Sequence, residues 1–301
     1  MSQIVQIKSF VLAAVTDQTR YVRSRNQAEQ LSKVNGLIVA DMPMVIQAMT
    51  THPEVREAIR PKWIYTITGE YHGQRDGDRS YEAWHSAGTL ATAKGLEKLY
   101  EQVGDYAFMP ISDDEWLAVG RGSYDGHTVF RVHLEDARKG NVPAAGTPYT
   151  IFARLDKDKP VINDKGRIDY DTFMADDRVL MITGSPESRE ALAKMLFGKK
   201  EDGGEGWSNI CSYYSVNGVG FDVQAKGRLA YLGKNYEGLG GEDSIFNVGR
   251  FVGVGSGGAV RAKNSSSGIV QPTLEQTLAV INNPDLNREG MIRAVSELYR
   301  Q

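Results

Sequence analysis

Glycines at residues 253–258 have a spacing that can bind phosphate. The segment RFVGVGSGGAV, residues 250–260, places Gly253, Gly255 and Gly258 in the pattern Gly-x-Gly-x-x-Gly. Such glycines hold a dinucleotide when they join a strand to a long helix within a βαβ unit, and a Walker-type loop adds Lys-Ser or Lys-Thr. Here barely two helical turns fit before SSSG, and neither lysine pair follows. We therefore expect a close approach of backbones at these glycines and no nucleotide or other cofactor.

Two of the five histidines lie in the segment HTVFRVHLE, residues 127–135. If this segment is a strand, His127 and His133 are about 20 Å apart and cannot share a metal ion. His133 and Glu135 could do so only if another element supplied further ligands. We expect a solvated polar face and no metal ion, with the opposite face in the core, formed by Thr128, Phe130, Val132 and Leu134.

Carboxylates cluster at four places, but none of the clusters has the spacing of a known catalytic or calcium-binding motif. They lack the twelve-residue loop with a central glycine that binds calcium. Ser256 also lacks the Gly-x-Ser-x-Gly setting of a hydrolase nucleophile. We expect the carboxylates to be solvated at strand ends. The clusters are Asp113-Asp114-Glu115, Asp156 with Asp158, Asp169 with Asp171, and Asp176-Asp177.

Several short motifs resemble the proteasome-type N-terminal-nucleophile hydrolases. VLMITGSPESREALAKML, residues 179–196, reads as a strand, a Gly-Ser turn and a helix, and FVGVGSGGAV follows after the pair VGFDV and GRLAYLG. The resemblance implies a catalytic Ser or Thr whose freed α-amino group is the base, with a lysine about 30 residues onward. The implied candidates are Thr147, exposed by cleavage after Gly146, or Ser2 together with Lys33. A hydrolase of this class is the alternative function.

Composition excludes several other classes of protein. Cys211 is the only cysteine in 301 residues, so an intrachain disulfide, a cysteine zinc site and a Cys-x-x-Cys redox pair are excluded. Lys and Arg number 35 against 38 Asp and Glu, with no basic run, so we do not expect nucleic acid as a partner. The apolar stretch FVLAAV, residues 10–15, is too short to span a bilayer. We predict a cytoplasmic protein without a membrane partner.

Periodicity predicts the elements that position these residues. Alternating apolar residues favour strands, with a hairpin formed by EWLAVGRG and HTVFRVHLE. GQRDGDRS, residues 73–80, is expected to be a loop that leads into a helix over 80–102. Further helices are expected over 53–59 after a Thr51–Glu54 capping box and from Pro186 after Ser185. Two helices are expected near the C-terminus, one with a cap formed by Thr273 and Gln276 and one over 287–299 with Leu298 on its inner face. The other expected strands are 2–15, 35–42, 62–71, 149–155, 179–183, 212–223, 227–233 and 245–254.

A linker candidate, ARKGNVPAAGTP, spans residues 137–148 and contains no large apolar side chain. It divides the chain into predicted lobes 1–140 and 147–301. Short connections favour an α+β fold with mainly antiparallel sheets and flanking helices. Because no catalytic constellation emerges, we interpret the chain as a non-enzymatic, self-associating structural or interaction protein. We expect it to be a homo-oligomer or to bind other protein subunits, as a component of a larger assembly does.

Overall fold

The computed structural model describes residues 3–7, 10–16, 19–103, 109–163, 168–197, 224–233, 239–241 and 248–255. The chain divides into two compact units, Met1–Val260 and Arg261–Gln301. The second unit lies outside the described residues, and so do the two predicted C-terminal helices with Leu298. The description below concerns the first unit.

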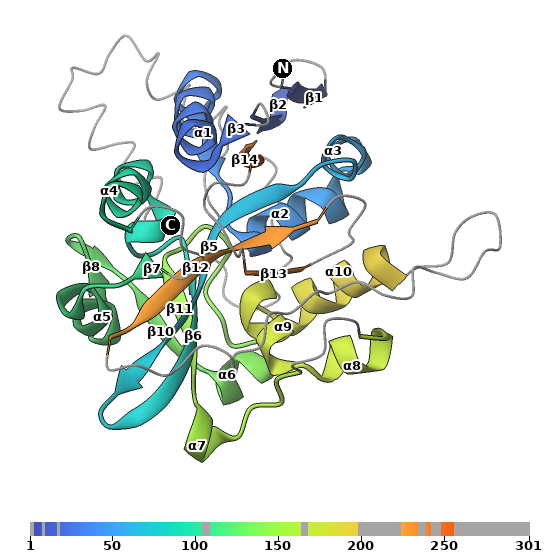
Figure 1. Ribbon diagram of the computed structural model, residues 1–301. Coiled ribbons are helices and arrows are strands. Elements are labelled where there is room, and N and C mark those ends of the chain that lie inside the picture. The colour runs from blue at the N-terminus through green and yellow to red at the C-terminus, as the bar shows by residue number, and fades with distance from the viewer. Residues whose placement is uncertain are drawn as a thin grey trace, which may run out of the picture. The chain divides into compact units, whose positions relative to one another are not determined.

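A large mixed sheet forms the centre of this unit (Figure 1). Most neighbouring strands are antiparallel; β14 with β5 and β10 with β11 are the parallel pairs among the described strands. The predicted α+β class with a mainly antiparallel sheet is therefore confirmed. The main strand order is β1 (Gln3–Ile7), β2 (Phe10–Val15), β14 (Val248–Gly255), β5 (Ile64–Arg75), β6 (Asp78–His85), β11 (Tyr149–Arg154) and β10 (Phe130–His133).

Short strands extend this sheet. Two of them, β3 (Thr19–Arg20) and β4 (Leu37–Val39), pair with β14. On the other side of β5 lies β12 (Lys226–Leu232), which also pairs with β7 (Met109–Pro110) and β13 (Leu239–Gly241). A separate two-stranded hairpin joins β8 (Ser123–Tyr124) to β9 (His127–Thr128).

Helices cover both faces of the central strands. Figure 1 shows α2, α9 and α10 on one side of β5 and β6, and α4 and α5 on the other. The buried clusters agree, since residues of α2, α9 and α10 pack together while Trp116 and Val119 of α5 pack with Tyr71 and Trp84. The helices are α1 (Tyr21–Asn35), α2 (Met42–Thr51), α3 (Pro53–Ile59), the 3-10 helix η1 (Thr89–Ala91), α4 (Ala93–Val103), α5 (Asp113–Gly120), α6 (Leu134–Arg138), α7 (Leu155–Asp158), α8 (Tyr170–Ala175), α9 (Asp177–Thr183) and α10 (Pro186–Phe197).

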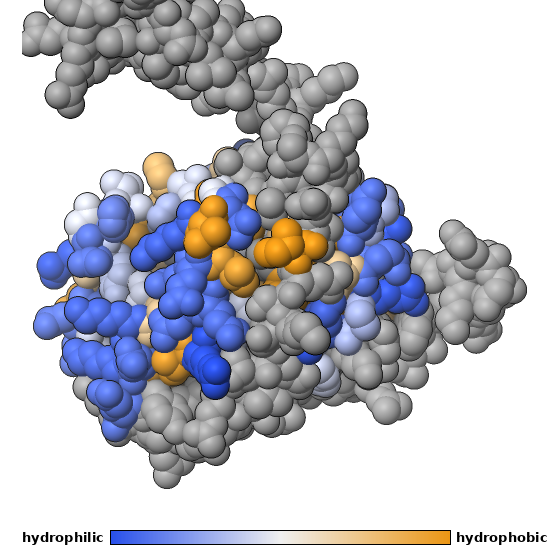
Figure 2. All heavy atoms as spheres, turned by 90° about the horizontal axis from the view of Figure 1, so that it is seen from above, coloured by the Kyte–Doolittle hydropathy of each residue, from blue (hydrophilic) through white to orange (hydrophobic). Residues whose placement is uncertain are grey.

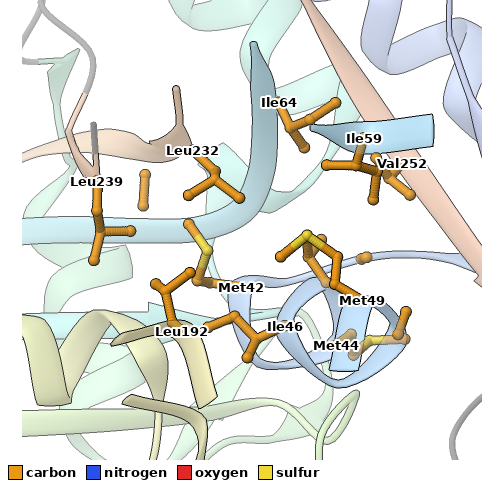
Figure 3. Packing of buried hydrophobic residues seen from close by; sticks show 14 of the residues in the cluster. Met42, Met44, Ile46, Met49, Ile59, Ile64, Leu192, Leu232, Leu239 and Val252 are labelled. Atoms are coloured by element: carbon orange, nitrogen blue, oxygen red, sulfur yellow. The ribbon is translucent and has the colours of Figure 1, made fainter. Parts of the chain in front are cut away.

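The helix α2 carries the methionine-rich part of the core. Met42, Ile46 and Met49 are at most 1% exposed. Figure 3 shows them among Ile59, Ile64, Leu192, Leu232 and Val252, which come from helices and strands far apart in the chain. Unbranched methionines fill irregular gaps between such elements. Burial of α2 therefore holds the sheet and α10 together.

The segment predicted as a loop leading into a long helix is a β-hairpin. Arg75 pairs with Asp78, which leaves Asp76 and Gly77 as a two-residue turn with φ angles of 53° and 81°. Positive φ at both positions is the requirement of the turn that best matches strand twist, and Asp-Gly satisfies it. The predicted helix over 80–102 was wrong for residues 80–92, where β6 and η1 lie, and α4 begins at Ala93.

Two apolar runs predicted as strands are helices. EWLAVG belongs to α5, which Ser112 caps by accepting a hydrogen bond from the Glu115 backbone at 3.2 Å. VLMIT belongs to α9, which begins at the Asp176 cap and ends at Gly184 with φ of 86°. Every residue of α9 is buried, so no polar face reveals its helical period.

The helix α3 forms as predicted, but the capping box does not. Thr51 is the last residue of α2 and its hydroxyl donates to the Gln47 carbonyl at 2.8 Å. His52 occupies the N-cap position of α3 without a side-chain cap bond. The cap predicted for α10 is confirmed, because the Ser185 hydroxyl oxygen accepts from the Ser188 backbone at 3.1 Å.

The lobe boundary at 137–148 remains a prediction. Residues on the two sides of it belong to one sheet, since β10 pairs with β11 and β5 pairs with β12 and β14. Any lobes that exist are therefore joined by backbone hydrogen bonds as well as by the linker.

Candidate functional site

The residues implied by the hydrolase resemblance are only partly described. Ser2 lies outside the described residues, and Lys33 is an exposed residue in the last turn of α1. The Thr147 backbone nitrogen donates to the Ala144 carbonyl at 3.1 Å within the loop before β11. The strand expected before the Gly-Ser turn is the helix α9, so that element of the resemblance is wrong. The catalytic roles of Ser2, Lys33 and Thr147 stay predictions.

The glycine motif marks a close approach within β14. Gly253 pairs with Ala14 of β2 and with Val39 of β4. A Cβ at Gly253 would lie 2.7 Å from the Ser32 hydroxyl of α1 and 3.3 Å from the Leu37 Cβ. Side chains of α1 and β4 therefore lie close to Gly253, whereas the expected close approach of backbones stays a prediction. Ser256 and Gly258 lie outside the described residues.

The carboxylate clusters support helices more than strand ends, which corrects the sequence interpretation. Asp169 and Asp176 cap α8 and α9, accepting from the Thr172 and Arg178 backbones at 2.8 Å each. Glu115, in the first turn of α5, accepts from the Thr89 backbone and hydroxyl. Anionic groups are stabilised at helix N-termini because the unpaired backbone N–H groups point toward them.

The structure places His133 beside Asp158, two residues that the sequence named as candidates in different motifs. The His133 Nε2 lies 2.9 Å from Asp158 Oδ2, and its Nδ1 accepts from the Glu135 backbone at 3.3 Å. Nε2 therefore carries the ring hydrogen and donates a hydrogen bond to the Asp158 carboxylate. The Glu135 carboxylate instead pairs with Arg138. With both ring nitrogens engaged, His133 has no free nitrogen for use as a general base.

Phe130, which the alternation placed in the core, is 51% exposed. It precedes Val132, which is buried, and its backbone nitrogen donates to the Pro148 carbonyl at 3.0 Å. Phe130 is exposed because β10 lies at the end of the main strand order and only part of it is covered.

Ser86, His85 and Asp41 lie near one another where β6 ends and α2 begins, but they are hydrogen-bonded in the wrong order for a catalytic triad. Ser86 donates directly to Asp41 at 2.8 Å. His85 Nε2 donates to the Met181 carbonyl at 2.9 Å, so its Nδ1 accepts from Thr68 at 3.0 Å. A triad needs the histidine between nucleophile and carboxylate. This network therefore connects α2, β5, β6 and α9 structurally.

One face of the β5–β6 hairpin contains a sealed ionic cluster centred on Glu70, here called the Glu70 cluster. Glu70 accepts from Arg178 Nε at 2.5 Å, from Arg228 Nε at 2.8 Å and from the Tyr81 hydroxyl at 2.7 Å. Its side chain and that of Arg178 are 0% exposed, and that of Arg228 is 1% exposed. Burial favours the protonated acid, but the charges of Arg178 and Arg228 outweigh burial and hold the pKa of Glu70 well below its usual range.

The opposite face carries a second, partly open cluster, here called the arginine–aromatic face and defined by Arg75, Glu82, Arg131, Phe152 and Arg154. The register places Glu82 beside Phe152, and Arg154 beside Ser80. Arg75 Nε donates to Glu82 at 2.8 Å, and the Arg131 guanidinium lies 3.4 Å from the same carboxylate. Burial raises the pKa of Glu82, but the nearby Arg131 and Arg75 charges lower it more, and the net shift is downward.

Aromatic rings support two of the three guanidinium groups of this face, and Asp158 pairs with the third, that of Arg154. The Arg131 guanidinium carbon lies 4.2 Å from the centre of the Phe152 ring, and that of Arg75 lies 4.2 Å from the Trp116 ring. Side-chain exposure is 13% for Arg75, 17% for Arg131 and 42% for Arg154. The three cations are therefore held in place while keeping access to solvent.

Sequence reasoning missed both clusters, because their members lie far apart in the chain. The alternation along β5 and β6 could have placed Glu70 and Glu82 on opposite faces, but it could not have supplied their arginines. Among the described residues, no group of three His, Cys, Asp or Glu side chains could hold a metal ion. No helix in the described part of the chain is long and apolar enough to cross a membrane.

Comparison with known proteins supports the fold. No family model and no curated protein matches the sequence. A solved chain, from a study of how massive sequence variation in Nanoarchaeota is accommodated by the C-type lectin fold, covers 80% of this chain and 97% of its own length. The TM-score is 0.56 and the sequence identity is 15%. At this identity the likeness is one of fold: the chain is similar in architecture to a C-type lectin-fold protein.

Proposed function

We propose that this chain is a non-enzymatic interaction protein that self-associates through the outer edge of β10. The observation that carries the proposal is the position of this strand at the end of the main strand order. Among the described strands β10 pairs only with β11, and its first residue, Phe130, is 51% exposed. An edge strand presents unpaired N–H and C=O groups that can extend a sheet into a second chain.

The surroundings of β10 favour binding over catalysis. His133 at the end of the strand uses both ring nitrogens, one toward Asp158 and one toward the backbone of α6. A general base needs a free nitrogen within reach of a substrate proton. The likeness to a C-type lectin-fold protein agrees with this proposal, because the fold of that neighbour accommodates massive sequence variation. A fold that accommodates many different sequences can carry surface residues that are specific for one partner.

Exposed large apolar residues also occur elsewhere among the described residues: Ile4, Val34, Ile38, Trp63, Leu117, Val161 and Tyr170. Figure 2 shows a face on which hydrophilic residues predominate among those described, with several apolar groups close together near its middle. Single exposed apolar residues are normal in soluble proteins, whereas one on an unpaired strand edge combines two features of an interface. Leu117 of α5, which is 48% exposed, provides a matched apolar residue away from the sheet edge.

Light scattering across a concentration series tests self-association. We expect the average mass of the full-length protein to rise with concentration, because dimerisation follows mass action. Phe130→Ser should shift the protein toward monomer, and Leu117→Ser should leave the mass curve unchanged. Thermal melts of both variants verify that they are folded. A monomer at every concentration, or equal effects of the two substitutions, would contradict the proposal.

We further propose that the protein is cytoplasmic and forms part of a larger particle. The single cysteine, Cys211, supports a reducing compartment because it can form no intrachain disulfide. Fractionation of cells producing the tagged protein tests this directly, and recovery of the protein outside the cytoplasm would contradict it.

A further inference from the structure

We infer that the arginine–aromatic face binds the carboxylates of an acidic segment in a partner protein. The inference is independent of self-association, because it concerns the face of the sheet and a different chain. It follows from three features of the face: excess positive charge, buried donors without partners, and the spacing of the guanidinium groups.

The charge of this face is not balanced internally. Three guanidinium groups, of Arg75, Arg131 and Arg154, share the carboxylates of Glu82 and Asp158. The neighbouring pairs, Arg79 with Asp156 and Lys157 with Asp78, each contribute one charge of each sign. One positive charge therefore remains, on groups that reach solvent, and it attracts an anion.

Buried polar atoms on the same face lack hydrogen-bond partners among the described residues. They are Arg75 Nη2, Arg154 Nε and Thr150 Oγ1. The register places Thr150 opposite both Trp84 and Arg131, on the side of the sheet that bears the guanidinium groups. Most buried polar atoms in proteins are paired. Two of these atoms belong to arginines whose side chains are partly exposed, so a small movement of the guanidinium group brings an unpaired donor to an acceptor from outside. A carboxylate supplies two acceptor oxygens and matches the planar guanidinium group.

The spacing favours successive carboxylates on an extended segment over a single small anion. The Arg131 guanidinium lies over Phe152, and Arg154 follows two residues later on β11. Two residues of a strand span about 7 Å. Acidic side chains at alternate positions of an extended segment project from one side at the same separation. One such segment can therefore engage both arginines together.

Gly120 keeps Arg75 in position on this face. A Cβ at Gly120 would lie 1.7 Å from Arg75 Nη1, which donates to the Trp116 carbonyl at 3.0 Å. Any side chain at Gly120 must push the guanidinium group away from its place on the Trp116 ring. Gly120→Ala thus displaces a cation of the face without removing a charge.

Fluorescence anisotropy with a labelled octapeptide of alternating Glu and Ser tests the inference. We expect binding at low salt that weakens as salt is added, because exposed charge pairs are screened. Arg131→Gln and Arg154→Gln should each weaken binding about tenfold, which corresponds to one charge-assisted hydrogen-bonded pair. Gly120→Ala should weaken it several-fold, about two- to fivefold, since Arg75 keeps its charge but loses its position.

Matched controls identify the chemistry that is recognised. Arg121→Gln, at an exposed arginine just after α5, should leave the affinity unchanged. A Gln–Ser octapeptide should not bind, and inorganic phosphate should compete only weakly. Because Arg154 is 42% exposed, its variant remains informative even if Arg131→Gln fails to fold. Light scattering on the same full-length samples records the oligomeric state, so failure of self-association is recognised separately.

Three results would overturn the inference. The first is equal binding of the Glu–Ser and Gln–Ser peptides. The second is phosphate binding at concentrations where the acidic peptide does not bind. The third is an Arg154→Gln protein that binds the acidic peptide as tightly as the unaltered protein.

Discussion

The two faces of the β5–β6 hairpin hold similar groups in different settings. On one face Glu70 is bound by Arg178 and Arg228, with all three side chains at most 1% exposed. On the other, Glu82 is bound by Arg75 and Arg131, which are 13% and 17% exposed. In both clusters two guanidinium groups share one buried carboxylate. The two clusters contain the same types of residue, and they differ in how far their arginines are exposed to solvent.

The difference in cover indicates a difference in role. Arg178 belongs to α9, whose residues are all buried, so its pairing with Glu70 fixes this helix against the sheet. The arginines bound to Glu82 keep contact with water and can exchange it for a ligand. A sealed cluster therefore specifies the fold, whereas a partly open one can serve recognition.

Neutralising each glutamate gives the largest expected effects. Glu70→Gln leaves two buried guanidinium groups without a countercharge and should lower the free energy of unfolding by about 3–5 kcal/mol. Glu82→Gln should cost less, about 1–2 kcal/mol, because Arg75 and Arg131 can turn toward water. Denaturant unfolding of both variants measures the difference. Equal losses would contradict the distinction between the clusters.

Acid should destabilise the protein through its buried histidines. Burial lowers the pKa of His85 to about 3 despite the hydrogen bond to Met181. Burial likewise lowers the pKa of His72 to about 3, although the charge of Glu70 opposes the shift. The unfolded chain takes up a proton near pH 6.5, whereas the folded one does not until about pH 3. Stability is therefore lost as the pH falls from 6.5 toward 3, by about 1.4 kcal/mol per pH unit for each histidine.

Replacement of one histidine isolates its contribution. His85→Gln should reduce the slope of stability against pH between 6.5 and 4.5 by about 1.4 kcal/mol per unit, whatever its effect on stability itself. Contributions from other groups, such as Asp41, cancel in this comparison. An unchanged slope in the His85 variant would show that His85 is protonated in the folded protein.

A smaller effect is expected at the close approach between β14 and α1. In Gly253→Ala the added methyl would meet the buried Ser32 hydroxyl at 2.7 Å, and the Ser32 side chain or α1 must shift to accommodate it. Overpacking of this kind costs about 1–3 kcal/mol. Ser32→Gly in the same protein removes the closest contact and should restore part of the loss, measured by denaturant unfolding. No loss in Gly253→Ala would show that the helix has room to move.

Several strands could be predicted from the sequence more reliably than the turn and the helix that pack beside them. Alternation identified β5, β11, β12 and β14, because each has a regular pattern of apolar residues and bounding turn residues. The turn at Asp76-Gly77 was also present in the sequence as an Asp-Gly pair between alternating segments, but the surrounding charge favoured a loop. The helix α9 could not be identified by periodicity, since burial on every side removes the polar face.

The candidate site could not be assembled from the sequence. Glu70 meets residues 108 and 158 positions away, and Arg75 reaches Glu82 only because the hairpin folds back. Local patterns record which way a side chain points along a strand but not which strand or helix lies opposite. His133 shows the same limit: its position on a polar face was predictable, but its contact with Asp158 depends on the chain returning through β11 and α7.

Hydrogen exchange at the arginine side chains tests the contrast between the two clusters most directly. The Nε–H groups of Arg178 and Arg228 donate to Glu70 at 2.5 Å and 2.8 Å in a sealed setting. Nuclear magnetic resonance of isotope-labelled protein should show these protons exchanging at least about tenfold more slowly than the Nε–H proton of Arg131. The Arg131 signal is assigned by its loss in Arg131→Gln. Comparable exchange rates in the two groups would show that the clusters are equally open and would contradict the account.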